Sequence, residues 1–174
     1  MKYPQNRWTR MLFVIVILMG GIFSLVSPAR AQGIQITFDD SIPAGETVNN
    51  DAMLAGTNVN MDGDVVGDLM AVGAVVEVNG DVDGSLVAVG QNVVINGAVG
   101  GTTYVAAVTL ELGPDAELGR NLYFIGLSLN TEEGSLIGRD LVIVSTGAQL
   151  NGEIDRNTVG TIGLFELFKV FMDM

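Results

Sequence analysis

One short phrase recurs seven times between Val48 and Val159, at a step of seventeen residues that twice lengthens to nineteen. The phrase starts with an apolar residue, continues through two turn-like residues and a small polar residue, and usually ends on another apolar residue. Its copies begin at Val48, Val65, Val82, Val99, Leu118, Ile137 and Ile154. A fixed period of this length is typical of a solenoid, in which each repeat forms one coil that stacks on the previous coil.

Within each repeat, apolar residues alternate with polar or small residues, as in the segment 76–78. This period of two is that of a β-strand. Glycines and Asx-Gly pairs such as Asn79-Gly80 separate the short strands, and we expect them at corners that require positive φ. Seventeen extended residues trace a loop of roughly 55 Å, which closes into about three short sides. The sequence therefore predicts an all-β, single-stranded β-helix (β-solenoid) of about seven coils over residues 32–159.

The same alternation identifies the side chains that point into the core, because inward positions repeat from coil to coil. The predicted inward residues are Val59, Met61, Val65, Leu69, Ala71, Val76, Val78, Val82, Leu86, Ala88, Val93, Ile95, Val99, Thr103, Val105, Leu110, Leu112, Leu118, Leu122, Phe124, Leu129, Ile137, Leu141 and Ile143. The two longer steps add their extra residues within 112–118 and 131–137. We expect both insertions at one corner, where they leave the stacking of the other sides intact.

Residues 1–31 have the pattern of a secretory signal peptide. Three basic residues, Lys2, Arg7 and Arg10, precede an apolar run over 11–26, and small residues occupy positions 29 and 31. Cleavage before Gln32 predicts an exported protein, either extracellular or in the cell envelope. An uncleaved segment would instead anchor the chain in a membrane, because about sixteen apolar residues nearly span a bilayer.

Residues 160–174 have a different pattern. Charged residues at 166, 169 and 173 are three and four residues apart, so a helix would place them on one face and Leu, Phe and Val on the rest. We expect this short C-terminal helix to cap the last coil, whose apolar interior would otherwise meet water. An interfacial membrane helix and a partner-binding segment are the alternatives. The candidate capping or self-assembly residues are Leu164, Phe165, Phe168 and Phe171.

The charge of the chain restricts its partners. It has 8 basic and 20 acidic residues, and four of the basic residues precede Gln32, so residues 32–174 carry a net charge of −16. Nucleic acid and anionic lipid are poor partners for such a surface.

The composition also restricts the chemistry. The chain has no His and no Cys, which removes the commonest general bases, thiol nucleophiles and zinc ligands. None of its glycines forms a nucleotide-binding fingerprint at a strand-to-helix junction. We therefore expect no enzymatic activity, no cofactor and no metal.

Two polar columns remain as candidate sites. The first contains Asp51, Asp68, Ser85, Thr102, Asn121, Asp140 and Asn157. Carboxylates in such a column could act on sugars, but a small polar residue in every coil favours a structural hydrogen-bonded ladder along a turn. The second column contains Arg120, Arg139 and Arg156. These arginines either form surface ion pairs that contribute little each or bind a polyanion such as an acidic polysaccharide.

The unit Gly-Asp-Val-x-Gly-Asp-Leu at 63–69, repeated with Ser85 at 80–86, resembles the bactofilins, or polymer-forming cytoskeletal proteins. The resemblance covers most of residues 45–158. It implies a right-handed β-helix that assembles end to end into non-polar filaments without bound nucleotide, and that scaffolds cell-shape or envelope machinery, often against a membrane. Bactofilins are typically cytoplasmic, so the export signal favours an envelope or extracellular role for this chain.

The sequence thus leads to a functional hypothesis of a non-enzymatic, self-assembling scaffold of the cell envelope. Its main partner would be further copies of the chain, with a membrane surface or an envelope polysaccharide as additional partners. The alternative is a secreted binding module whose β-helix face holds a polysaccharide.

Overall fold

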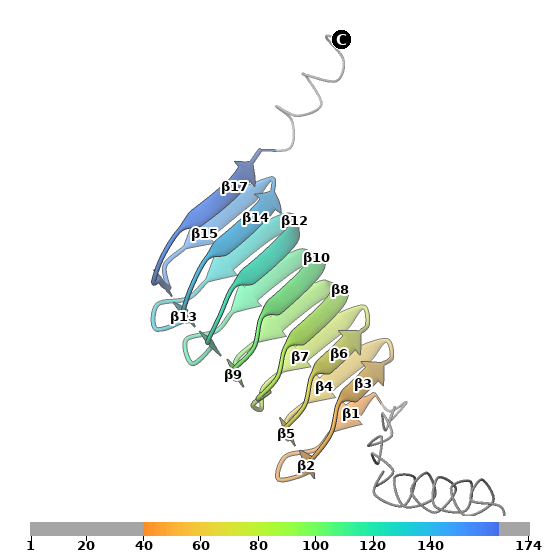
Figure 1. The fold of residues 1–174 in the computed structure, drawn as a ribbon. Helices are drawn as coiled ribbons and strands as arrows, with labels where there is room; N and C mark the ends of the chain where they lie inside the picture. The colour runs from red at the N-terminus through yellow and green to blue at the C-terminus, as the bar shows by residue number, and fades with distance from the viewer. Residues whose placement is uncertain (1–39, 164–174) are drawn as a thin grey trace, which may run out of the picture. The chain divides into compact units, whose positions relative to one another are not determined.

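The computed structural model describes residues 40–163, and the regular structure of this part consists of β-strands. The strands wind into seven stacked coils that follow one another along the stack in chain order, as the colours of Figure 1 show. Successive coils are joined by parallel strand pairing. The predicted all-β solenoid of about seven coils is confirmed. Residues 40–163 contain no helix that is long and apolar enough to cross a membrane.

Each coil has three sides, and equivalent sides of successive coils form three faces of the stack. The first face contains β3 (Ala52–Ala55), β6 (Leu69–Val72), the first halves of β8 (Leu86–Ile95), β10 (Thr103–Leu112) and β12 (Leu122–Thr131), then β14 (Leu141–Ser145) and β17 (Thr158–Ile162). The second face contains β1 (Ser41–Ile42), β4 (Asn58–Met61), β7 (Val75–Val78), the second halves of β8, β10 and β12, and β15 (Gly147–Leu150). The long strands join these two faces into one sheet.

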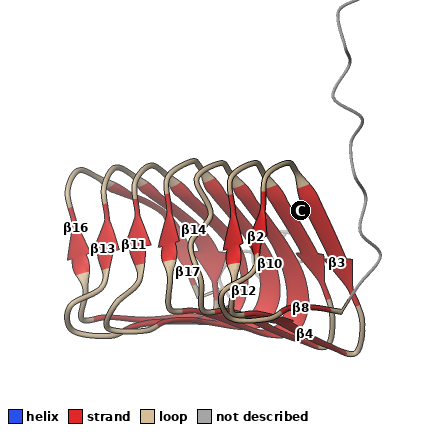
Figure 2. Ribbon diagram, turned by 90° about the horizontal axis from the view of Figure 1, so that it is seen from below, coloured by secondary structure: helices blue, strands red, loops and turns tan. Residues whose placement is uncertain are grey.

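The third face is made of two-residue strands. It contains β2 (Thr47–Val48), β5 (Asp64–Val65), β9 (Ala98–Val99), β11 (Glu117–Leu118), β13 (Leu136–Ile137) and β16 (Glu153–Ile154). Val82 bridges β5 and β9, so the third face also continues from the first coil to the last. Figure 2 shows β11, β13 and β16 on a side of their own.

Strand pairing holds equivalent residues of successive coils over one another. The register Ala52↔Leu69↔Leu86, for example, keeps the seventeen-residue step. The two nineteen-residue steps insert their extra residues between Leu112 and Glu117 and between Thr131 and Leu136, at the corner that joins the second face to the third. As predicted, both insertions lie at one corner, and the pairing on either side of them is uninterrupted.

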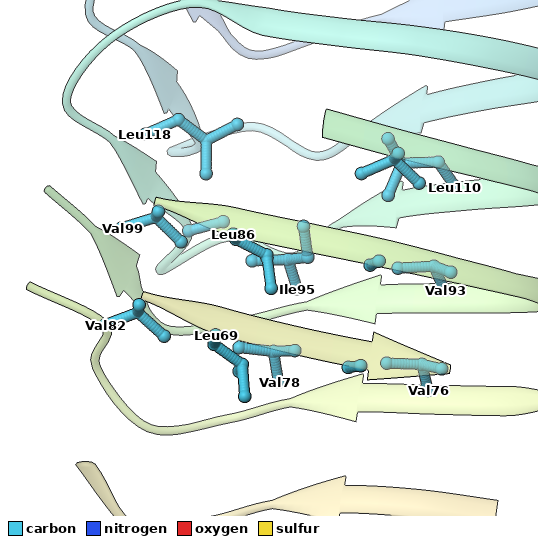
Figure 3. Packing of buried hydrophobic residues seen from close by; sticks show 14 of the residues in the cluster. Leu69, Val76, Val78, Val82, Leu86, Val93, Ile95, Val99, Leu110 and Leu118 are labelled. Atoms are coloured by element: carbon cyan, nitrogen blue, oxygen red, sulfur yellow. The ribbon is translucent and has the colours of Figure 1, made fainter. Parts of the chain in front are cut away.

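The interior is one narrow core of stacked side chains. Every inward residue predicted from the alternation is buried, with at most 3 % of its surface exposed. Figure 3 shows Val82, Val99 and Leu118 in one such line of the core. Thr103 lies in the same core, and its Oγ1 has no hydrogen-bond partner, a burial that costs about 1–3 kcal/mol.

The corner glycines are required for a reason other than the predicted one. Gly80 and Gly97 do not have positive φ. Instead, a Cβ on Gly97 would overlap the carbonyl oxygen of Gly80 in the preceding coil, and a Cβ on Gly80 would overlap that of Gly63. The expectation of positive φ at these corners was therefore wrong. Side chains are excluded because the backbones of successive coils approach closely there.

The solenoid also extends further than predicted. Strand β17 continues to Ile162, which pairs with Ser145 of β14, whereas the sequence placed the boundary after residue 159. Gly160, at which the residue pattern of the sequence changes, is thus part of the last coil. The predicted signal peptide and the capping residues Leu164, Phe165, Phe168 and Phe171 lie outside the described residues.

The close approach of the coils predicts the effect of adding a methyl group at Gly97. We expect Gly97→Ala to lower the free energy of unfolding by about 1–3 kcal/mol, the usual cost of overpacking. Gly147 has no atom within 4 Å of a built Cβ and no positive φ. Gly147→Ala should therefore leave stability unchanged or raise it by about 0.4–1 kcal/mol. Denaturant unfolding of both variants measures the difference, and equal stabilities would contradict this explanation of the glycine column.

Candidate functional site

The arginine column is formed as the sequence predicted. Arg120, Arg139 and Arg156 occupy equivalent corner positions of three successive coils, because the pairs on both sides of them keep one register. The backbone N–H of Arg156 donates to the carbonyl oxygen of Arg139 at 3.3 Å. All three side chains are exposed. Within residues 40–163 none of them forms an ion pair with a carboxylate, so three cationic groups at a coil spacing of about 4.8 Å face solvent.

The position that lies closest to the preceding coil shifts by one residue along the stack, and this shift explains why the arginines begin at the fifth coil. In earlier coils Gly84 and Gly101 occupy this column, and a Cβ at either position would lie within 2.7 Å of the preceding coil's backbone. In later coils the close approach lies one residue earlier, at Gly119 and Gly138, whose Cβ would lie 3.1 and 3.0 Å from a carbonyl oxygen below. The fourth coil has glycine at both positions, 100 and 101. From the fifth coil on, the column accepts a long side chain.

The aspartate column is a hydrogen-bonded ladder. Oδ1 of Asp51 accepts the backbone N–H of Asp68 at 2.9 Å, and Oδ1 of Asp68 accepts that of Ser85 at 2.7 Å. Oδ1 of Asp140 likewise accepts the backbone N–H and Nδ2–H of Asn157 at 3.3 and 2.9 Å. Each carboxylate thus pairs with the next coil and not with a second carboxylate. The structural interpretation of this column is confirmed.

Two further ladders were missed from the sequence. On one, Nδ2 of Asn96 donates to Asn79 and Nδ2 of Asn79 donates to Asp62, both at 2.7 Å. On the other, Oδ1 of Asp81 accepts the backbone N–H of Ala98 at 2.9 Å. The sequence contained the signal, since Asx residues recur at the coil step. The Asx-Gly pairs were interpreted as turns alone, and no partner in the next coil was assigned.

The described residues contain no group of three acidic, His or Cys side chains that could hold a metal ion. The exposed carboxylates of the third face, Asp64, Asp81, Glu117 and Glu153, lie on different coils along its strands. Their distribution gives that face an acidic surface.

The two ends of the stack differ in exposure. On the first coil, the inward residues Ile42, Ala52 and Leu54 are at most 5 % exposed. On the last coil, β17 is exposed along its whole length, and Ile162 has 52 % of its surface accessible. Among residues 40–163 no strand pairs with the far edge of β17. The last coil is therefore the more exposed end of the described stack, and we call it the open end.

The outward side of the first face is apolar from end to end. We call it the apolar face, and its outward residues are Met53, Ala55, Met70, Val72, Val87, Val89, Tyr104, Ala106, Tyr123, Ile125, Val142, Val144, Val159 and Thr161. None of them is charged. The rings of Tyr104 and Tyr123 stack with centroids 5.1 Å apart, beside a shallow hollow that reaches Ile125. The sequence contained a signal for this face in four-residue runs without alternation, such as 122–125.

No family model, no curated protein and no solved structure matches this chain. The candidate surfaces are therefore judged on geometry alone: an open end, an exposed arginine column and an apolar face.

The ladder predicts a difference between two substitutions at Asp68. Asp68→Ala removes the acceptor for the Ser85 backbone N–H and should destabilise the solenoid by about 1 kcal/mol, the net contribution of one hydrogen bond. Asp68→Asn keeps an acceptor oxygen at this position, so its loss of unfolding free energy should be less than half that of Asp68→Ala. Thermal or denaturant unfolding provides the comparison. An Asn variant as unstable as the Ala variant would show that the carboxylate charge, and not the ladder bond, is what matters.

Proposed function

We propose that this protein is a non-enzymatic structural scaffold of the cell envelope that assembles through the ends of its β-helix. The open last coil is the observation that carries the proposal. An unpaired parallel strand edge is a template on which another chain can add its own strands. Solenoids avoid this only where a terminal cap covers the edge.

The hydrogen-bonding groups at the open end can be identified from the coils below. Leu141 donates its N–H forward to Asn157 of the next coil, and Ser145 accepts from Gly163 through its carbonyl oxygen. The residues of β17 in register with these two are Thr158 and Ile162. Among residues 40–163, β17 is the last strand of its face. The corresponding groups of Thr158 and Ile162 therefore point away from the described stack, toward the position that a strand of another copy would take.

Apolar side chains accompany this edge. Leu150 and Ile154 belong to the last coil and pack against the core from one side while remaining partly exposed. A second copy stacked here would bury them, which contributes about 25 cal/mol for each Å² removed from water. A joint of last coil to last coil has two-fold symmetry and uses the same surface twice. The bactofilin resemblance implies non-polar filaments, and such filaments would contain a symmetric joint of this kind.

A filament needs a second joint, and we propose that the strand edges of the first coil form it. Strands β1 and β3 each pair with one neighbour among residues 40–163, so their far edges are also without a strand partner in the described part. Alternating joints at the two ends would extend the assembly into a filament. An acidic exported rod would remain soluble between its joints, because its carboxylates are dispersed over the long sides.

The open end predicts that a charge placed on it blocks assembly. Thr158 is exposed and occupies an inward column of the last coil, so Thr158→Lys should leave the coil folded. In a joint the ammonium group would be buried without a partner, at a cost of about 3–5 kcal/mol. Association should weaken roughly a hundredfold or more. Sedimentation and negative-stain microscopy over a concentration series measure the shift from filaments to shorter species.

Ser128→Lys is the matched control, since Ser128 is exposed on the second face of an inner coil. It adds the same charge and should leave filaments unchanged. If both variants assemble like the parent chain, the last coil is not a joint. A parent chain that remains monomeric at every concentration would reject the scaffold proposal itself.

The arginine column supports a second candidate function, the binding of an acidic polysaccharide. Its three exposed guanidinium groups have no carboxylate partner within residues 40–163 and repeat at the coil spacing. We propose that a polyanion with charges along its length would lie across the column and contact successive coils. Each exposed contact would contribute about 0.2–1 kcal/mol.

This second proposal predicts that Arg139→Ala combined with Arg156→Ala weakens polysaccharide binding by about tenfold, the sum of two such contacts. The double Lys variant keeps the charge and should retain most of the affinity. Calorimetric titration of the parent chain and both variants with an acidic polysaccharide measures the affinities. Absence of saturable binding by the parent chain would exclude this function.

A further inference from the structure

The apolar face is too long and too uniform to be an ordinary exposed surface. Its outward residues come from seven strands of the first face, and all but Thr161 are apolar or aromatic. Several are strongly exposed, with accessible fractions of 46 % for Tyr104, 60 % for Ile125 and 59 % for Val159. Contiguous apolar surface of this kind marks an interaction site on a soluble protein. The end-to-end joints of the proposed scaffold do not use it.

The size of the face limits what it can bind. Seven strands at about 4.8 Å and four residues at about 3.3 Å give a flat area of roughly 30 by 13 Å, or about 400 Å². Two such faces in contact would bury at least about 800 Å², and more once the relief of the side chains is included. A stable interface buries about 1,200–2,000 Å². The flat area of one pair of rods therefore falls below this range, while rods joined end to end would multiply the buried area and reach it.

The charges favour a second copy of this chain as the occupant. Residues 32–174 carry a net charge of −16, and the third face exposes Asp64, Asp81, Glu117 and Glu153. The second face carries Glu77 and Glu111. Among the three long faces, only the uncharged apolar face therefore lets two copies approach without opposing carboxylates. Lipid is a poorer occupant, because the Asp51 and Asp68 carboxylates lie along one margin of the face and a net acidic surface is repelled by anionic headgroups.

We propose that the apolar faces of two copies pack against each other, so that rods associate side by side as well as end to end. The pairing uses a surface separate from the end-to-end joints and would be strengthened by them. A symmetric pair has a two-fold axis through the centre of the face. Because β10 is the fourth of the seven strands, it meets the β10 of the second copy whether the rods are parallel or antiparallel.

The absence of cysteine from the chain allows this contact to be tested with single thiols. Ala106 lies on β10 in the apolar face, and Thr109 lies on the same strand in the second face. Full-length chains carrying Ala106→Cys or Thr109→Cys are oxidised over a concentration series, each also carrying Thr158→Lys to remove the last-coil joint. We expect Ala106→Cys to form covalent dimer at least several-fold faster than Thr109→Cys, with a rate that rises with concentration.

A second pair of variants tests the whole face. Ile125→Lys places a charge on an already exposed apolar side chain and should abolish the Ala106→Cys crosslink, whereas Asn92→Lys on the second face should leave it intact. Circular dichroism verifies that both remain folded. Equal crosslinking of the Ala106 and Thr109 thiols would overturn the proposal.

Two other results would also overturn it by identifying another occupant. If the Ala106→Cys thiol resists maleimide in the monomer and becomes reactive when 164–174 are deleted, that segment covers the face. If the thiol becomes protected only when phosphatidylcholine vesicles are added, the occupant is lipid. Either result would leave the proposal of end-to-end joints standing, because Thr158→Lys tests those joints separately in an otherwise unaltered chain.

Discussion

The structure depends on the close stacking of successive coils. Every hydrogen bond between coils requires equivalent residues to lie over one another, and this requirement fixes the residue type of whole columns. Where the backbones approach closely, as at Gly80 and Gly97, no Cβ fits. Where side chains point inward, they form continuous apolar lines, and where they are short and polar, as at Asp68, they bond to the next coil. The period in the sequence is the direct consequence of this geometry.

The sequence was sufficient to predict the stack because the stacking repeats. One correct assignment of an inward residue, such as Val65, carries over to every coil, and for this reason the predicted core is buried throughout. Features that depend on contact between coils were harder to anticipate. The reason for Gly97 is the distance to the backbone of the preceding coil, which a single repeat does not reveal. The end of the solenoid was placed too early because Gly160, which pairs in β17, was interpreted as a break.

The candidate sites were predictable to different degrees for the same reason. The arginine column follows from the repeat alone, since positions 120, 139 and 156 share one register. The apolar face required the opposite reasoning. Alternation identifies strands with one buried side, whereas runs such as Leu141-Val-Ile-Val144 are apolar on both sides. Such runs contribute to the core and to the outer surface at once, and only the coil geometry shows that their second side has no covering layer among the described residues.

The three faces and two ends therefore have different chemistry on one rigid stack: an apolar face, a polar face, an acidic face and open strand edges. In the proposed scaffold, the ends would join copies lengthwise and the apolar face would join them side by side. The measurement that tests it most directly is the axial repeat of its assemblies by electron microscopy. Seven coils at about 4.8 Å make a rod of about 34 Å, so a non-polar filament with continuous joints should repeat every 67 Å or so. Monodisperse monomers at every concentration, or a repeat unrelated to the rod length, would contradict the account.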